Sequence, residues 1–392
     1  MVIPEGYKQT EIGIIPVDWN CDVAKHLMKI ETGSRNTEQK TDDGKYPFFV
    51  RSQKVEHINT YNYDCEAVLT AGDGVGTGKV FHHYIGKFDA HQRVYIMSNF
   101  SGILGRYFYN YFSENFGKEV SKYTAKSSVD SVRRDMIAEM MIPLPPIEEQ
   151  SFISQSLMDI DYMISSLEKL IAKRKAVKQG AMQELLTGKK RLPGFGGMIN
   201  KVRLSDIAFI KDGTHSTYER ISDGVLLLSA KNIFNNHLEI TENESMVSDD
   251  DYMAIVSNGF PKNGDILLSC VGTIGRCCIY SGIPKAAFQR SVAFVRSKGV
   301  DTGYLLYLLQ LENTQKQLRE SANASAQGGV YLGALENLKV EITNDLNEQS
   351  AIASILSDMD NEIDALEQKL EKARQLKQGM MQQLLTGKIR LV

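Results

Sequence analysis

The residues with the clearest chemical potential lie in a glycine-rich stretch, Gly72–Lys79, which resembles a phosphate-binding loop. Such a loop needs a glycine six residues before its lysine and Ser or Thr directly after it, but Asp73 and Val80 occupy those positions. A second stretch, Cys270–Arg276, fails the same test. Both are predicted to be tight turns between strands, and their last residues, Lys79 and Arg276, are candidate phosphate contacts.

Other patterns for catalysis or metal binding are weak or missing. His82, His83 and His91 form the one histidine cluster of the sequence, but neighbouring strand residues point to opposite faces, whereas a metal needs converging ligands. There is no Asp-Pro-Pro-Tyr or Asn-Pro-Pro-Phe loop of an amino-methyltransferase, no nuclease signature, and no Ser, His and Asp set that spacing connects. The sequence therefore predicts no active site, no metal and no cofactor in this chain.

Composition is that of an ordinary globular protein. The 392 residues carry a formal net charge of −3, so a nucleic-acid surface would have to be local. The five cysteines include no CxxC pair, which indicates a reduced, cytosolic compartment. No secretory signal and no apolar run of the roughly 20 residues that span a bilayer are present, so we expect a cytoplasmic protein without a membrane partner.

The elements that must position any functional residue are organised by a repeat. Glu149–Leu192 returns 199 residues later as Glu348–Leu391, and the match is densest over the last residues, Lys178–Leu192 against Lys377–Leu391. A tandem of two similar halves follows, each consisting of a variable globular segment and a nearly invariant helix.

Both helices carry apolar residues at alternating spacings of four and three, which is the a/d pattern of a coiled coil. These residues are Ile153, Leu157, Ile160, Ile164, Leu167 and Ile171 in the first copy and Ile352, Leu356, Met359, Ile363, Leu366 and Leu370 in the second. We expect the two copies to pack on each other and to end where Gly188 and Gly387 adopt a left-handed conformation. A length of roughly 25 to 30 residues predicts about 40 Å per helix.

The sequence predicts that both variable segments form mixed α/β domains. Strands are predicted at Tyr46–Arg51, Ala67–Thr70, Lys79–His83 and Arg93–Met97, and a helix at Gly105–Phe116. Short matches such as Ala90–Arg93 with Ala287–Arg290 indicate that the second segment has the same fold with different loops. The predicted fold class is α+β: two similar globular domains separated by two long antiparallel coiled-coil helices, with a pseudo-two-fold internal repeat. The predicted segments are 1–147, 148–192, 193–199, 200–345 and 346–392.

A basic run follows the coiled-coil pattern in each copy. It comprises Lys169, Lys173, Arg174, Lys175, Lys178, Lys189, Lys190 and Arg191, and in the second copy Lys369, Lys372, Arg374, Lys377, Lys388 and Arg390. Three interpretations stay open: a solvated helix face, a track for a duplex backbone, and a surface for an acidic partner. The acidic stretch Glu239–Asp251 is expected to be a solvent loop.

The repeat ending Lys-Gln-Gly-x-Met-Gln-x-Leu-Leu-Thr-Gly-Lys-x-Arg-Leu and the opening Tyr7–Trp19 resemble the specificity subunit of a type I restriction-modification system over essentially the whole chain. The resemblance implies two target recognition domains, each reading one half of a bipartite double-stranded DNA target. It also implies that the helices act as a spacer and dock two methyltransferase subunits and, where present, restriction subunits. S-adenosylmethionine, ATP and Mg would then act in those partners, and this chain would be non-catalytic.

The candidate DNA-binding residues come from loops at equivalent places in the two halves. Loops that differ are candidates for base readout, because residues shared by both halves cannot distinguish two half-sites. The candidates are Ser34, Arg35, Asn36, Arg51, Gln53, Lys54, Lys79, Arg93, Lys126, Ser127, Arg133, Arg134, Thr214, His215, Lys231, Asn232, Arg276, Arg290, Gln327 and Tyr331. The candidate partner-docking residues are Met182, Leu185, Leu186, Met381, Leu384 and Leu385.

Two other classes of function compete with this one. A coiled-coil scaffold whose two domains bind proteins would not prefer a target DNA sequence. A self-contained nuclease or methyltransferase is disfavoured by the missing motifs. If the helices are a spacer, their length should set the gap between the two half-sites.

Overall fold

The computed structural model describes residues 3–124, 131–325 and 328–391. The chain forms two compact units: a first unit of residues 1–168 and 368–392, and a second unit of residues 169–367. Each unit therefore contains one globular domain, half of one long helix and half of the other. The units do not coincide with the predicted segments, because the division falls inside both helices.

The globular domain of the first unit is built on a six-stranded sheet in the order β4-β9-β7-β8-β5-β6. Neighbouring strands are antiparallel except for β5 and β8, which are parallel. The strands are β4 (Lys29–Thr32), β5 (Tyr46–Phe49), β6 (Glu56–Ile58), β7 (Tyr63–Ala71), β8 (Phe81–Ala90) and β9 (Val94–Ser98). The four predicted strands are thus confirmed, with boundaries that differ by several residues.

Helix α2 (Gly105–Thr124) supplies an aromatic layer against this sheet and confirms the predicted helix. Phe108, Phe112 and Phe116 recur every fourth residue on one helix face, and their rings stack with centroid distances of 5.1 and 4.4 Å. Phe81 of β8 meets the ring of Phe112 edge-on at 5.4 Å. All three helix phenylalanines are fully buried, so this layer forms the core of the domain.

The second unit repeats this strand order with one interruption. Its sheets have the orders β12-β18-β15-β16 and β14-β13-β17, so that β16 and β17 together occupy the place of β8. The parallel pair β13 and β17 corresponds to β5 and β8. The strands are β12 (Ala208–Asp212), β13 (Val225–Leu228), β14 (Met246–Val247), β15 (Ile266–Ser269), β16 (Cys277–Ile279), β17 (Ala286–Phe288) and β18 (Val292–Ser297). The predicted common fold of the two domains is confirmed.

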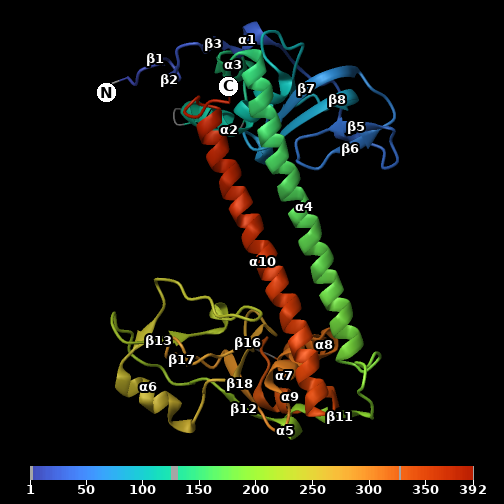
Figure 1. Cartoon of the computed structure of the whole chain (residues 1–392), viewed down its shortest axis with the longest axis vertical. Helices are drawn as coiled ribbons and strands as arrows, with labels where there is room; N and C mark the ends of the chain where they lie inside the picture. Colours follow the sequence, from blue (N-terminus) through green and yellow to red (C-terminus); the bar gives the residue numbers. More distant parts are fainter. Residues whose placement is uncertain (1–2, 125–130, 326–327, 392) are drawn as a thin grey trace. The chain divides into compact units, whose positions relative to one another are not determined.

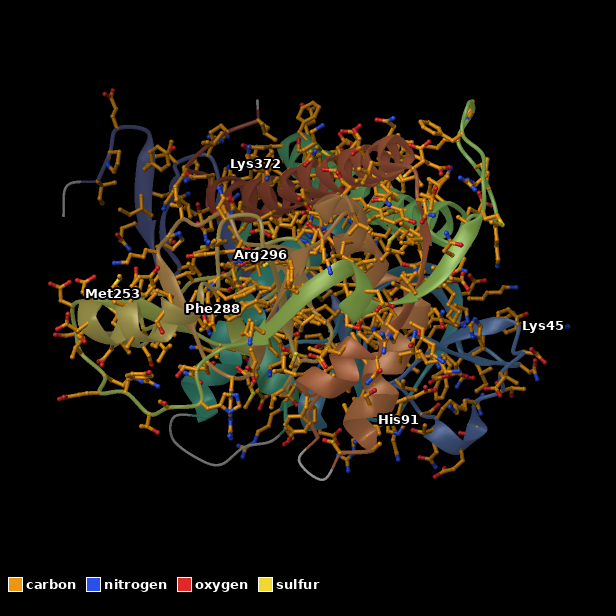
Figure 2. The ribbon with its side chains drawn as sticks, turned by 90° about the horizontal axis from the view of Figure 1, so that it is seen from below. Lys45, His91, Met253, Phe288, Arg296 and Lys372 are labelled. Atoms are coloured by element: carbon orange, nitrogen blue, oxygen red, sulfur yellow. The ribbon has the colours of Figure 1, made fainter. Side chains whose placement is uncertain are left out.

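Helices α7 (Thr302–Gln310) and α8 (Glu312–Asn323) take the place of α2 in the second unit. Phe288 is fully buried beside Phe294, whereas Met253 of α6 (Asp249–Ile255) is 62% exposed (Figure 2).

The remaining helices and strands of the two units, apart from the two long helices, are β1 (Tyr7–Thr10), β2 (Gly13–Pro16), β3 (Asn20–Val23), α1 (Ala24–Leu27), α3 (Arg134–Ala138), β10 (Met141–Leu144), β11 (Ile199–Arg203), α5 (Leu204–Ile207), α9 (Leu332–Glu336) and β19 (Lys339–Thr343).

The two long helices are α4 (Ile147–Leu185) and α10 (Leu346–Leu384), each of 39 residues (Figure 1). At a rise of 1.5 Å per residue each is about 58 Å long, which is longer than predicted. Ion pairs show that they run antiparallel within each unit. In the first unit Glu168 pairs with Arg374 and Asp161 with Lys377. In the second unit Arg174 pairs with Glu362 and Lys178 with Asp360, again in opposed order.

The apolar seam predicted from the four and three spacing is largely buried. Ile153, Leu157, Ile352 and Leu356 are at most 1% exposed. The helix ends also follow the prediction, because Gly188 and Gly387 have φ of +68° and +69°. A Cβ at these glycines would lie 2.4 Å from the side chain of Ile199 and 2.5 Å from that of Pro16, respectively. Glycine is therefore required here by both backbone conformation and packing.

Candidate nucleic-acid interface

In the first unit, three loops meet around Asp73. Arg51, just after β5, donates to Oδ1 of Asp73 at 2.8 Å, and Nε of Arg93 lies 3.6 Å from Oδ2. A β-bridge joins Asp73 to Ser131, three residues before the start of α3. The glycine-rich stretch thus forms a turn between β7 and β8, as predicted, and a Cβ at Gly76 would lie 2.5 Å from the carbonyl oxygen of Arg51. The arrangement gathers exposed cations at one edge of the sheet.

The adjacent loop with Ser34, Arg35 and Asn36 is fixed by internal hydrogen bonds. Arg35 donates from Nε to the buried carboxylate of Asp89 at 2.8 Å and from Nη2 to Thr60 at 3.2 Å. Asn36 accepts from Gln92 at 2.7 Å, and Ser34 accepts from the amide of Asn62 at 3.0 Å. Because the Nε and Nη2 groups of Arg35 already donate hydrogen bonds within the domain, Arg35 is better suited to fixing the loop conformation than to a bidentate guanine contact.

In the second unit, the corresponding loops surround a cavity of about 320 Å³. His215 contacts the carboxylate of Asp212 at 2.6 Å on one side, and a β-bridge joins Thr214 to Gln289. Arg290 and Tyr331 line the same cavity from the β17–β18 turn and from the residue before α9. The cavity therefore brings together candidate residues that are far apart in the sequence.

The two loop clusters occupy equivalent places in the two sheets. The Asp73–Ser131 bridge of the first unit corresponds to the Val271–Gly329 bridge of the second. In both clusters the residue that caps the following short helix is exposed: Arg133 before α3 and Tyr331, 50% exposed, before α9. The same backbone framework thus presents an arginine in one unit and a tyrosine in the other.

The candidate cations fall into two groups according to their partners. Besides Arg35 and Arg51, Lys54 pairs with Glu56 at 3.4 Å, and Lys231 with Glu244 at 2.8 Å. Arg134 donates to the carbonyl of Ile30 at 3.4 Å. Over the described part of the chain, Lys79, Arg133, Arg276 and Arg290 form no ion pair with a carboxylate, and Gln53 is exposed. Arg276 lies over the ring of Phe234, 4.6 Å from its centroid. These four cations are therefore the better candidates for phosphate or base contacts.

One candidate for base readout is corrected by its burial. Asn232 is only 2% exposed, and its amide nitrogen donates to Glu244 at 2.8 Å and to the carbonyl of Glu239 at 3.0 Å. Glu244, expected in a solvent loop, is also buried. Its burial disfavours the charged form, yet hydrogen bonds from Lys231, Thr241 and Asn232 outweigh this and lower its pKa to about 2. Asn232 and Glu244 thus brace the loop internally.

Two further groups of candidates need comment. Lys126, Ser127 and Gln327 lie outside the described residues. His82 and His83 have different partners, the carbonyl of Ser52 and the carboxylate of Glu66, and among the described residues no group of His, Cys, Asp and Glu could hold a metal ion.

The six candidate partner-docking residues are corrected as well. Met182, Leu185 and Leu186 belong to the hydrophobic core of the second unit, and Met381, Leu384 and Leu385 to that of the first. None is more than 9% exposed. The end of each helix copy therefore completes the core of the globular domain encoded by the other half of the sequence.

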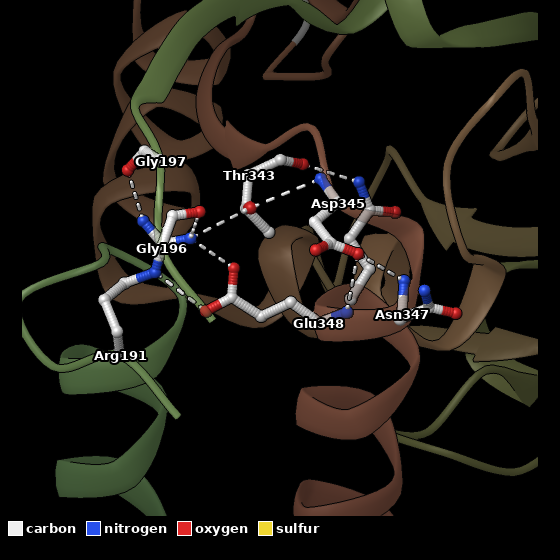
Figure 3. A network of polar contacts seen from close by, with 8 residues as sticks. Arg191, Gly196, Gly197, Thr343, Asp345, Asn347 and Glu348 are labelled. Atoms are coloured by element: carbon white, nitrogen blue, oxygen red, sulfur yellow. Dashed lines mark hydrogen bonds and ion pairs between the residues drawn. The ribbon is translucent and has the colours of Figure 1, made fainter. Parts of the chain in front are cut away.

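At each helix end an arginine pairs with a buried glutamate, an arrangement we call the clasp. In the second unit Arg191 donates to both oxygens of Glu348, which is 1% exposed, at 2.7 and 2.5 Å, and to the carbonyls of Gly196 and Gly197 (Figure 3). In the first unit Arg390 donates to both oxygens of Glu149 at 2.7 and 2.8 Å. Arg191 and Arg390, the last residues of the two basic runs, thus pair with carboxylates of the chain itself.

The clasp of the first unit also recruits the opening motif. Arg390 forms a bidentate pair with Asp18, and the indole of Trp19 donates to Glu149 at 2.9 Å. Asp18, Trp19 and the two glutamates were not among the candidate residues. The sequence did contain the signal, because Glu149 and Glu348, like Arg191 and Arg390, are separated by the repeat offset of 199 residues.

The geometry defines a duplicated α/β binding module with exposed, differing loop clusters on equivalent frameworks. Comparison with known proteins agrees with this class: the family model "Type I restriction modification DNA specificity domain" matches residues 16–178 and 199–375. The chain belongs to this family and is a non-catalytic type I restriction-modification specificity subunit, a component that recognises DNA sequence.

Several relatives cover nearly the whole chain. The MjaVIII specificity subunit of Methanocaldococcus jannaschii is 26% identical, covering 99% of this chain and 96% of its own length. A putative MjaX specificity subunit of the same organism is 25% identical over 99% of this chain and 97% of its own. The crystal structure of an S subunit from M. genitalium has the same fold, with a TM-score of 0.65, 14% identity, and coverage of 93% of this chain and 96% of that one. No helix among the described residues is long and apolar enough to cross a membrane.

Proposed function

We propose that each globular domain reads one half of a bipartite double-stranded DNA target. The observation that carries this proposal is the pair of equivalent loop clusters, which share a framework and differ in exposed side chains. Two similar domains on one chain suit two half-sites, as symmetric dimers suit palindromes. Lys79, Arg276 and Arg290 suit phosphate contacts, whereas Arg133 and Tyr331 suit base readout, because they differ at one position of the framework.

The catalytic steps belong, in this proposal, to partners. Two methyltransferase subunits would supply S-adenosylmethionine-dependent modification, and restriction subunits, where present, would use ATP and Mg. The chain itself would bind no cofactor and would act in the cytoplasm, where its DNA lies. The docking surface must lie outside the six buried residues at the helix ends, because these fill the cores.

The experiment is to co-express the chain with a type I methyltransferase subunit from the same genome and to map modified bases across that genome. We expect a two-part motif with a fixed gap. Arg133→Ala should relax one half-site, because a bidentate arginine contact contributes about 1–3 kcal/mol to base discrimination. Lys79→Ala is the matched control and should weaken modification uniformly while leaving the motif intact.

The outcomes separate the competing functions. Modification without sequence preference would favour the protein-binding scaffold, and modification by the purified chain alone would favour a self-contained enzyme. The same map tests the spacer: inserting one helical turn after Lys173, with its equivalent after Lys372, should lengthen the gap between the half-sites.

A further inference from the structure

The cavity of about 320 Å³ in the second unit has an apolar floor and a polar rim. The floor consists of residues that are at most 4% exposed, namely Cys270, Ala293, Val330 and Leu335. The rim is formed by exposed or half-buried residues with polar groups, which include Asp212, His215, Gln289, Arg290 and Tyr331. Small-molecule sites in proteins have this composition, with volumes of about 300–1,000 Å³.

The strand ladders identify the residue of the first unit that corresponds to Ala293. Ala293 is the second residue of β18 and pairs with Leu268, the residue before the last of β15. Tyr95 is likewise the second residue of β9 and pairs with Thr70, the residue before the last of β7. The second unit therefore has an alanine where the first unit has a tyrosine.

In the first unit the ring of Tyr95 fills the equivalent space. Its hydroxyl donates to the carbonyl oxygen of Val132 at 3.2 Å, and a Cβ at Gly72 would lie 3.2 Å from the ring. Val132 donates its own amide to Gly72, as Val330 of the second unit does to Cys270. Val330 and Cys270 both line the cavity, so the cavity lies where the first unit holds an aromatic ring.

Hydrogen-bonding groups surround this space in the second unit. The carbonyl of Val330 corresponds to the one that accepts from Tyr95, and no described residue donates a hydrogen bond to it. The side-chain amide of Gln289 is also without a hydrogen-bond partner over residues 3–124, 131–325 and 328–391. His215 contacts only one oxygen of Asp212, at 2.6 Å. A ring bound here would thus meet both donors and acceptors at its edge.

A nucleobase combines a flat aromatic ring with donors and acceptors along its edge. Proteins that bind an extruded base hold it by stacking on aromatic or apolar side chains and by hydrogen bonds to that edge. Tyr331, which is 50% exposed at the rim, can stack on such a ring, and Arg290 can contact the adjoining phosphate. An apolar side chain of a protein partner would instead leave Gln289 and the carbonyl of Val330 without hydrogen bonds.

We propose that this cavity binds a single unstacked nucleobase. The base comes either from the half-site that the second unit reads or from a free nucleotide, because both present the same ring and edge. The inference rests on the proposed function and adds a base-binding site to the second unit. The first unit reads its half-site without such a site, since Tyr95 occupies the equivalent space.

Two variants alter the cavity in different ways. Cys270→Gly/Ala293→Tyr gives the second unit the pair that Gly72 and Tyr95 form in the first, and so places a ring in the cavity. Gln289→Ala removes one edge group and leaves the cavity open. Met253→Ala, at a 62% exposed residue of α6, is the matched control in the same unit. Thermal unfolding of each variant verifies that the fold is intact.

The DNA arm of the test uses the complex of the chain with its methyltransferase and a duplex that carries the mapped target. In the half-site that Arg133→Ala leaves unchanged, bases are replaced one at a time by the fluorescent analogues 2-aminopurine or pyrrolocytosine, whose emission rises on unstacking. A methyltransferase also extrudes the base that it modifies, so the signal that counts is the one that the double variant removes.

We expect one such position in the half-site. The double variant should lower the affinity for the target about tenfold, because base stacking is lost, and Gln289→Ala should lower it less. Met253→Ala should change neither fluorescence nor affinity. A signal that all variants retain would belong to the methyltransferase and would count against the cavity.

The nucleotide arm measures binding of adenosine, guanosine, cytidine and thymidine monophosphates to the same complex without DNA, by saturation-transfer NMR. Binding that the double variant loses and Met253→Ala keeps would support the cavity with a free nucleotide as its ligand. The absence of a variant-sensitive signal in both arms would overturn the inference.

Two further outcomes are distinguishable. Weaker binding of the methyltransferase by the double variant, with neither signal changed, would identify a protein side chain as the occupant and would also overturn the inference. If the unaltered complex modifies no bipartite target, the proposed function itself fails, whereas the nucleotide arm still decides whether the cavity binds a base.

Discussion

In the clasp of each unit an arginine pairs with a buried glutamate, but the other groups that contact the arginine differ between the two units. Arg390 of the first unit adds the carboxylate of Asp18 and lies 5.7 Å from the ring centroid of Trp19. Arg191 of the second unit instead adds the backbone carbonyls of Gly196 and Gly197. The arginine and glutamate come from the repeat, whereas the additional partners come from segments outside it. The repeated sequence thus supplies the ion pair between arginine and glutamate, and each half of the chain supplies different additional hydrogen-bond partners for the arginine.

The largest effect should come from removing the tail that closes the first unit. A chain ending at Glu367 lacks Met381, Leu384 and Leu385, and each buried side chain of this size contributes about 2–5 kcal/mol. Their sum rivals the roughly 5–15 kcal/mol that stabilises a whole domain. We expect the first unit to lose its protection from hydrogen exchange, while the second unit, whose core lies within residues 169–367, keeps it.

A matched control for this truncation is a chain ending at Gly387, which keeps the three core residues and loses Arg390. It should retain most of the protection of the first unit. Equal loss of protection in both units of the shorter chain would show that the two cores depend on each other and would contradict the reciprocal closure described above.

A smaller effect is expected from removing one clasp at a time. Arg390→Ala leaves the 2% exposed Glu149 without its charge partner, and Arg191→Ala does the same to Glu348. Breaking a fully buried pair costs about 3–5 kcal/mol, and because these arginine side chains are 24% and 20% exposed, we expect about 2–3 kcal/mol.

The single tryptophan of the chain, Trp19, makes the two clasp variants distinguishable. Its fluorescence reports urea unfolding of the first unit, so Arg390→Ala should lower the midpoint of that transition, whereas Arg191→Ala should leave it in place. A shift of the same size in both variants would show that the clasps do not act locally.

The smallest effect concerns a brace that occurs only in the second unit. The pKa of Glu244 is about 2 in the folded chain and near 4.5 for an ordinary glutamate. Its contribution to stability is therefore fully present above pH 4.5 and is lost as the pH falls toward 2. Glu244→Gln should flatten the pH dependence of second-unit stability over this window by about 1–2 kcal/mol, because the Lys231 side chain that pairs with Glu244 is 65% exposed and solvent screens the interaction. Hydrogen exchange at several pH values measures the stability of the second unit. The same pH dependence in the variant as in the unaltered chain would show that the charge of Glu244 does not stabilise this unit.

Much of the fold could be predicted because it follows from periodicity. The four and three spacing identified the seam, and Gly188 and Gly387 marked the helix ends, since both features are local properties of the sequence. The loop clusters could also be paired in advance, because Ala90–Arg93 and Ala287–Arg290 mark the same turn in both domains.

The incorrect predictions share a cause, which is burial by distant segments. Leu185 and Leu384 looked available for partners, because nothing near them in sequence reveals that a globular domain covers them. Asn232 looked like a loop residue able to read adenine, yet its amide turns inward to Glu244. Helical periodicity states which side chains share a face but does not state what covers that face.

The reciprocal closure of the cores has a consequence for synthesis of the protein on the ribosome. All core-forming residues of the second unit have been made once Glu367 is added, whereas the first unit still lacks Met381, Leu384 and Arg390. The domain that is translated first is thus the last to be completed. Until then its unfinished apolar core remains a substrate for chaperones and proteases.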